Sequence, residues 1–252
     1  MLRCIAPVVC LAAGLLFAPL AVADVIEDWS SGNDAAWSRL DFLSSPPGPV
    51  NLGGSSYTVA GGTYTIASNS PLPALPSQLG AVSVFGPSIV SNAFSNGTLS
   101  TTVRINDSTT EAFLIARGNL ALGNYYNMNI GASRGGVFLS INVFSGFTSG
   151  ASLGNVNIPA IMPGTDYNVA FTFEGSALSG KVWPVGAPEP MAPQISILDA
   201  TYSAGAVGLG VSTFFNTQGP ISATYGPVSF IPGPGTAALA GLALLSSRRR
   251  RA

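Results

Sequence analysis

The side chains of this chain that can bind metal or move protons are its carboxylates. Histidine is absent, and both cysteines fall within the first ten residues. The densest acidic group comprises Asp24, Glu27 and Asp28. Carboxylate oxygens are ligands that Ca²⁺ prefers, so a calcium site forms if a distant acid such as Asp199 converges on Asp28. The alternative is a solvated, ligand-free stretch of chain.

The remaining pattern predicts no reaction. Histidine general bases and thiol nucleophiles are missing from the chain after Cys10. A glycosidase requires two carboxylates flanking the scissile bond, and no expected strand carries such a pair. No glycine-rich nucleotide loop stands between a strand and a helix. We therefore expect no catalytic residue, no enzymatic activity and no cofactor other than calcium.

Three tryptophans, Trp29, Trp37 and Trp183, are the largest rings available to stack on a sugar. In a β-sandwich a tryptophan more often lies in the core, where its large apolar surface is removed from water. Both interpretations remain open for each of the three.

The elements that must position these groups are β-strands. Apolar and polar residues alternate over Leu99–Asn106, Val137–Val143 and Asp166–Glu174, which is the period of a strand with one buried face. Further strands are expected at Val25–Trp29, Ala36–Phe42, Tyr57–Ala60, Thr63–Ala67, Ala81–Phe85, Glu111–Arg117, Tyr125–Ile130, Ala177–Trp183, Gln194–Leu198, Ala206–Thr213 and Ala223–Phe230. No helical period occurs between residues 24 and 230. The pattern predicts one all-β, two-sheet antiparallel sandwich over residues 24–230.

Two stretches without alternation, Leu43–Ser56 and Asn69–Leu79, are rich in proline and serine. They are expected to be surface loops, which are either simple excursions of the sandwich or carriers of a binding function.

Several short segments of the body resemble the concanavalin A-like lectin/glucanase superfamily in its laminin-G-like form. They are Glu27–Gly32 with Trp37, then Leu114–Arg117 followed by Asn124–Tyr126, then Asp199–Leu209. The resemblance implies a jelly roll of two antiparallel sheets. It implies no activity, because this fold carries lectins, hydrolases and inert modules alike. Some glucanases of the superfamily carry their carboxylates as Glu-x-Asp-x-x-Glu on one strand, and this chain has no such strand.

The charge distribution limits the partners. All eleven acidic residues lie between residues 24 and 230, whereas half of the ten basic residues lie outside this range. The body is therefore acidic and has no basic patch for nucleic acid.

The first 23 residues have the organisation of a secretory signal peptide. Arg3 supplies the positive start, an apolar run follows, and Ala21-Val22-Ala23 is a small-x-small cleavage site before Asp24. An uncleaved N-terminal anchor is the alternative. Removal of residues 1–23 would leave a mature chain without cysteine, and hence without disulfides.

Residues 231–252 form a three-part tail. Pro232, Gly233 and Pro234 make a hinge, an apolar run without charge follows to Leu245, and Arg248, Arg249, Arg250 and Arg251 form a basic cluster. The apolar run is short for a stable span of a bilayer, which needs about 20 helical residues. It therefore predicts transient or weak membrane association through a short C-terminal apolar helix, with the arginines held on the cytoplasmic side. The alternative is a terminal helix docked on the domain.

This order of hinge, apolar helix and arginine cluster resembles the PEP-CTERM sorting signals of Gram-negative bacteria. The resemblance implies export and processing by an exosortase-type machinery. Here the usual Pro-Glu-Pro is replaced by Pro232-Gly233-Pro234, which indicates a variant signal. A true Pro-Glu-Pro occurs at Pro188-Glu189-Pro190, where neither an apolar run nor an arginine cluster follows, and is expected to be a loop.

The sequence thus predicts an exported, non-enzymatic protein of the cell surface or extracellular matrix, which adheres or associates with polysaccharide. A lectin with a defined, calcium-dependent sugar site and a glycoside hydrolase with carboxylates on separate strands are the alternatives.

Overall fold

The structure, a computed structural model, describes residues 24–44, 47–49, 55–68, 79–86, 94–131, 138–146, 149–159, 161–213 and 220–233. The predicted leader (residues 1–23) and the tail from Pro234, with its arginine cluster, lie outside the described residues. The strands of the described part are β1 (Asp24–Glu27), β2 (Trp37–Ser44), β3 (Pro47–Pro49), β4 (Ser55–Ala60), β5 (Thr63–Ser68), β6 (Leu79–Phe85), β7 (Gly97–Ile105), β8 (Thr110–Asn119), β9 (Asn124–Gly131), β10 (Phe138–Ser145), β11 (Ser149–Asn157), β12 (Asp166–Glu174), β13 (Ala177–Pro184), β14 (Ile195–Leu198), β15 (Ala206–Thr213), β16 (Ile221–Tyr225) and β17 (Val228–Pro232).

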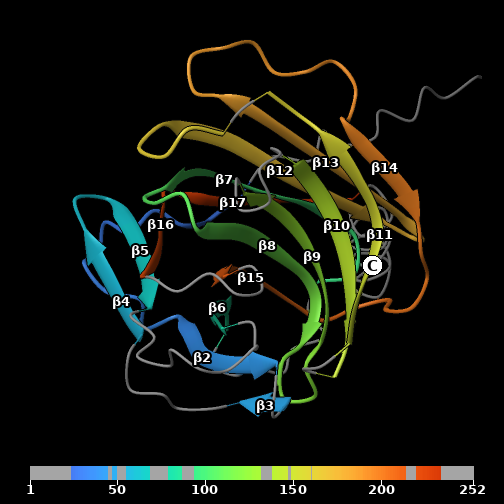
Figure 1. The fold of residues 1–252 in the computed structure, drawn as a ribbon, viewed down its shortest axis with the longest axis horizontal. Helices are drawn as coiled ribbons and strands as arrows, with labels where there is room; N and C mark the ends of the chain where they lie inside the picture. The colour runs from blue at the N-terminus through green and yellow to red at the C-terminus, as the bar shows by residue number, and fades with distance from the viewer. Residues whose placement is uncertain are drawn as a thin grey trace, which may run out of the picture.

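The strands form two antiparallel sheets that pack face to face (Figure 1). Sheet A has the order β14-β13-β12-β7-β16-β5-β4, with β17 joining β7 to β1. Sheet B has the order β11-β10-β9-β8-β15-β6-β2-β3. This arrangement confirms the predicted all-β, two-sheet antiparallel sandwich of the jelly-roll type.

Alternation along the central strands produces the core between the sheets. Every second residue of β7 and β12 is buried, including Leu99, Val103, Phe171 and Phe173. From the facing side, sheet B contributes side chains such as Leu114. Packing of these apolar faces removes them from water, which is the main favourable contribution to folding.

Two of the three tryptophans belong to this core. Trp29 and Trp37 are 1% and 6% exposed, and the Trp29 ring stacks on Tyr64 with centroids 4.5 Å apart. The Trp29 indole N–H donates to the carbonyl of Gly226 at 2.7 Å. These contacts assign Trp29 and Trp37 to packing and not to a sugar.

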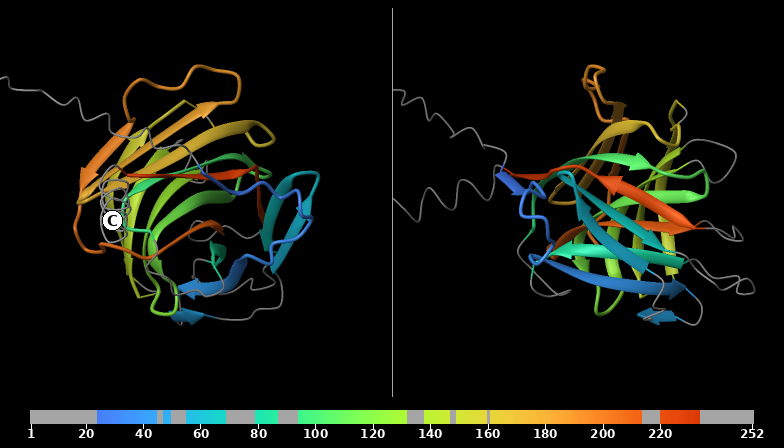
Figure 2. Two further views of the ribbon diagram at one scale, coloured as in Figure 1. Left: turned by 180° about the vertical axis from the view of Figure 1, so that it is seen from behind. Right: turned by 90° about the vertical axis from the view of Figure 1, so that its left-hand side faces the viewer.

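The sandwich is closed by its first and last strands. β1 pairs antiparallel with β17, so that Asp24 lies opposite Phe230, and β17 continues onto β7. Figure 2 shows the blue and red ends of the chain side by side at one corner of the molecule.

The structure differs from the sequence prediction in three strands. The expected strand Ala223–Phe230 is two strands, because the chain breaks at Gly226-Pro227 and passes from β16 to β17. The expected strand Val25–Trp29 ends at Glu27, since Trp29 has a φ of 60° that a strand does not accommodate. The β3 strand lies within Leu43–Ser56, which was expected to be a loop.

The strand β11 was missed altogether. Its sequence, Ser-Gly-Ala-Ser-Leu-Gly-Asn-Val-Asn, contains one β-branched residue, Val156, and no aromatic residue, although these residue types favour strands. It forms the edge of sheet B, and its pairing with β10 is interrupted by a bulge at Ile141–Asn142.

The predicted tail begins inside the sheet. Ile231 and Pro232 belong to β17, and the N–H of Gly233 donates to the carbonyl of Asn96 at 3.1 Å. The first two hinge residues, Pro232 and Gly233, are therefore held by the sandwich. Among the described residues, no helix is long and apolar enough to cross a membrane.

Candidate functional site

The outer face of sheet B carries polar side chains that a packing face does not need. Sheet B bends so that β11 and β3 turn toward the same side (Figure 1), and no described strand packs on the face inside this bend. Alternation brings to it, from β8, β9, β10 and β15, the side chains of Glu111, Phe113, Ile115, Tyr125, Asn127, Asn129, Ser140, Asn142, Phe144 and Ser212.

Its polar half is a ladder of amides across β9 and β10. Asn142 lies opposite Asn127, and Ser140 lies opposite Asn129. The Asn142 amide donates to Asn127 Oδ1 at 2.8 Å and to Ser140 Oγ at 3.1 Å. The Asn129 amide donates to Glu111 Oε2 at 2.7 Å. We call this set, with Ser212, the amide ladder.

Two atoms of the amide ladder have no hydrogen-bond partner. They are Asn129 Oδ1 and Ser212 Oγ, on residues that are 5% and 1% exposed. Ser212 lies opposite Glu111, which is itself bonded to Asn129, so the two atoms belong to one end of the face. A buried polar atom without a partner is destabilising. Both atoms are covered by neighbouring groups, so a ligand supplies the missing hydrogen bonds only where those groups move aside.

Aromatic rings lie at one end of the amide ladder and along its side. At the end, Tyr125 and Phe144 stack with centroids 4.7 Å apart and an interplanar angle of 11°, and the Phe144 ring lies against Gly150 of β11. Along the side, Phe113 lies opposite Asn129 and against Gly210 of β15. Phe144 and Asn142 are the partly exposed members of the set, so the face is most open between them.

The other half of the face is apolar. A second hydrophobic cluster, separate from the core between the sheets, comprises Val82, Val84, Phe113, Ile115, Leu120, Tyr125 and Ala206, and Leu40 and Phe144 pack against it. Such small clusters commonly lie beneath the long connections of a domain. This half is explained by packing, whereas the amide ladder is not.

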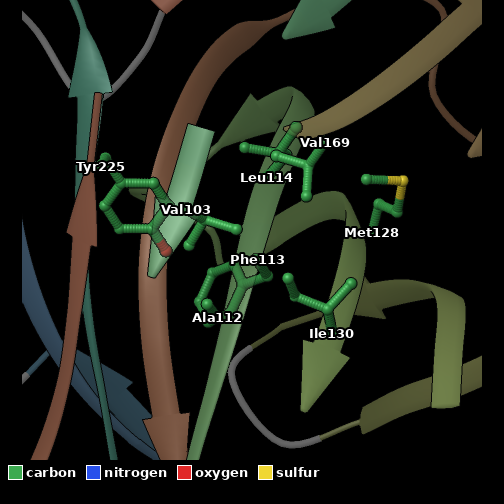
Figure 3. A pocket seen from close by; sticks show the side chains of 8 residues that line it. All are labelled: Val103, Ala112, Phe113, Leu114, Met128, Ile130, Val169 and Tyr225. Atoms are coloured by element: carbon green, nitrogen blue, oxygen red, sulfur yellow. The ribbon is translucent and has the colours of Figure 1, made fainter. Parts of the chain in front are cut away.

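The void between the sheets is too small for a ligand. It has a volume of about 10 Å³ and is lined by apolar side chains and Tyr225, as Figure 3 shows for residues such as Leu114 and Met128. A cavity of this size holds at most one water molecule. It is a packing defect of the core.

The structure does not bring the predicted calcium ligands together. Asp28 follows β1 and Asp199 follows β14, and the strands β13, β12, β7 and β17 lie between them in sheet A. Each residue follows the C-terminal end of its strand. Because β1 and β14 run in opposite directions along this antiparallel series, the two residues lie at opposite ends of sheet A. Within the described residues, no group of three or more acidic, histidine or cysteine side chains is placed to hold a metal.

Each of these two carboxylates has a local role instead. Hydrogen bonds from the hydroxyl and from the N–H of Ser30 lower the pKa of Asp28. Burial opposes ionisation of Asp199, but hydrogen bonds from the Tyr126 hydroxyl and from Thr201 outweigh it and lower the pKa of Asp199. Asp199 thereby fixes the turn that precedes β15.

The remaining candidates take different positions. Trp183 lies partly exposed on the outer face of sheet A, opposite Asn168. Pro188-Glu189-Pro190 is a loop, as expected, and Glu189 pairs with Lys181 at 2.6 Å. All eleven acids are described, and only Glu111 lies on the outer face of sheet B.

Sequence reasoning missed the amide ladder. Its only signal was the segment Asn124–Ile130, in which Asn127 and Asn129 occupy alternate positions of a strand whose other face is apolar. Such a pattern equally describes a solvated face, and the burial of these amides could not be read from it.

Solved structures of similar fold are concanavalin A-like jelly rolls. The carbohydrate binding module CBM66 from Bacillus subtilis matches with a TM-score of 0.51 and 15% identity, over 78% of this chain and 95% of that one. A β-glucanase of Bacillus licheniformis matches with a TM-score of 0.53 and 11% identity, over 82% and 97%. A structure described as a native glycosidic hydrolase gives 0.57 and 9%, over 84% and 95%.

No protein-family model and no curated protein matches the sequence. The structural likeness supports the jelly-roll fold, and at identities this low it says nothing of function, which must be argued from the site.

Proposed function

We propose that this protein is an exported, non-enzymatic β-sandwich that associates with neutral polysaccharide through the amide ladder. The observation that carries the proposal is the pair of unpartnered buried acceptors, Asn129 Oδ1 and Ser212 Oγ. Sugar hydroxyls supply hydrogen bonds of the kind that these atoms lack. Phe144, the partly exposed ring of the stacked Tyr125–Phe144 pair beside the ladder, offers apolar surface to the C–H face of a sugar ring.

The size of the face suits a chain of sugars. From Tyr125 to Gly131 the strand β9 advances about 20 Å, at about 3.4 Å per residue. The solved structures of similar fold include a carbohydrate binding module and the carbohydrate recognition domain of Emp47p. These likenesses agree with saccharide binding as the class of function.

The number of carboxylates on this face favours binding over hydrolysis as the function. Glycosidases act with two carboxylates on either side of the scissile bond. Glu111 has no second acid on its face of the sheet, and its Oε2 already accepts from Asn129. A hydrolase would need an acid that this face does not offer.

Binding is tested by titrating the purified chain with soluble neutral polysaccharides, a mixed-linkage β-glucan and an arabinoxylan. We expect the wild-type protein to bind one of them and to melt at a higher temperature in its presence. Asn129→Ala should weaken binding about 5- to 10-fold, as loss of one hydrogen bond of about 1 kcal/mol predicts. Asn106→Ala, an exposed amide on sheet A, is the matched control. Equal binding by both variants, or release of reducing sugar by the wild type, would contradict the proposal.

Export is tested separately, by intact mass and fractionation of the protein from its native host. The proposed route predicts loss of residues 1–23 and of the segment after about Pro234, with the protein in the extracellular or outer-envelope fraction. A full-length tail retained in the inner membrane would contradict sorting and leave the saccharide proposal standing.

A further inference from the structure

The outer face of sheet A, on the opposite side of the sandwich, has an unusual composition. Across β7, β12 and β13 its side chains are small and hydroxylated or amidated: Thr98, Ser100, Thr102, Asn168, Thr172 and Ser179. Some already bond to one another across strands, as Thr98 Oγ1 and Thr172 Oγ1 do at 2.8 Å. The face is therefore a flat array of hydrogen-bonding groups.

Trp183 is the only aromatic ring among the described residues that these three strands place on this face. It lies opposite Asn168, and Asn168 lies opposite Thr102, so the three form one row across β13, β12 and β7. Its ring is half-buried and not enclosed in the core. A large amphipathic ring beside donors and acceptors is the combination that favours contact with a partner.

The two cations that these three strands place on this face, Arg104 and Lys181, are both paired. Lys181, two residues before Trp183 on the same strand face, is held by Glu189 at 2.6 Å. Arg104 is held by Asp166 through two hydrogen bonds of 2.9 and 2.5 Å. With its cations paired, the row around Trp183 suits an uncharged ligand better than an anionic one.

We infer that Trp183, Asn168 and Thr102 form a second saccharide contact, so that one molecule joins two polysaccharide chains. The indole ring stacks on the C–H face of a sugar, and Asn168 and Thr102 bond to its hydroxyls. The two faces point away from each other across the sandwich, so one polysaccharide segment cannot reach both. This inference rests on the proposed function, because the first contact is the amide ladder.

Cross-linking distinguishes two sites from one. The full chain is mixed with the mixed-linkage β-glucan or arabinoxylan that it binds, and light scattering is followed across protein-to-polysaccharide ratios. We expect the wild type to raise scattering to a maximum that falls again at excess protein, as bivalent binders do. Trp183→Ala should bind with Kd changed less than about 3-fold at the amide ladder, yet raise no scattering. Trp183→Phe, which keeps a ring, should restore part of it.

The outcomes separate the two proposals. Absence of binding by the wild type overturns the proposed function. Binding with scattering unchanged in both Trp183→Ala and Asn168→Ala overturns the second contact alone. An unchanged melting temperature of Trp183→Ala shows that the variant is folded and that lost scattering reports a lost contact.

Discussion

The ring of Phe113 lies against Gly210 on the neighbouring strand. A β-carbon at position 210 would lie 2.3 Å from Phe113 Cε2, closer than any real contact of this kind. Only glycine therefore allows the ring to cover β15, and the ring lies beside Asn129 of the amide ladder.

Replacing this glycine tests the contact. Gly210→Ala should lower the free energy of unfolding by about 1–3 kcal/mol, because the ring must move off its site. Phe113→Ala costs several kcal/mol alone by leaving a cavity. The double variant should lose less stability than the sum of the losses in the two single variants, since the added methyl no longer meets a ring. Strictly additive losses in the free energy of unfolding, measured by urea denaturation, would show that the Phe113 ring and Gly210 do not interact.

The buried guanidinium of Arg117, on β8, ties two loops together. It donates to the carbonyls of Ser95 and Tyr202 at 2.9 Å each and lies over the Phe173 ring at 5.5 Å. Burial lowers its pKa, and among the described residues it forms no ion pair. Arg117→Met should destabilise the fold by about 2–4 kcal/mol, because two buried carbonyls lose their donors. Arg104→Met, on the exposed face, is the control and should cost under about 1 kcal/mol.

The carboxyl of Asp34 makes stability depend on pH. Burial opposes its ionisation, but hydrogen bonds from Arg39 and the Tyr64 hydroxyl outweigh this and lower its pKa. A lowered pKa in the folded state means that the contribution is present above the unfolded-state value of about 3.9 and is lost as pH falls through the folded value. The wild type should therefore lose stability below about pH 4. Asp34→Asn should be less stable at pH 7 and should show a shallower loss on acidification. Parallel curves for the two proteins would exclude this role.

Removing the hydroxyl of Ser212 should separate stability from binding. Its Oγ is buried without a partner. Ser212→Ala should therefore leave the free energy of unfolding unchanged or raise it by up to about 1 kcal/mol, and the melting temperature should follow. The same change should weaken saccharide binding, because one acceptor is lost. Ser56→Ala, on an exposed position of β4, should alter neither property. A destabilised Ser212→Ala would mean that the hydroxyl is already satisfied in the free protein.

The strands were predictable where one face is wet. In β12, for example, Tyr167, Val169, Phe171 and Phe173 alternate with polar residues, and the structure confirms the strand from Asp166 to Glu174. Alternation carries this information because the side chains of a strand point to opposite faces.

The amide ladder could not be predicted, because alternation does not reveal whether the polar face of a strand is buried. In β8 and β9 both faces are buried, so Asn127 and Asn129 resemble solvated residues in the sequence although they are not. Their partners, Ser140 and Asn142, come from another strand whose register is set by pairing and not by local sequence. Likewise β11, in which Val156 is the one β-branched residue, is held as an edge strand by its pairing with β10.

The pairing of Asp24 with Phe230 joins the first described strand to the last. A contact between residues so far apart in sequence is slow to form, since the loop that closes it is nearly the whole domain. During synthesis β1 must therefore wait for β17, and until then the edge of β7 at Gly97–Ser100 has no partner. An unpaired edge of this kind is open to strands of other molecules. The domain is thus most vulnerable to aggregation just before its last strand arrives.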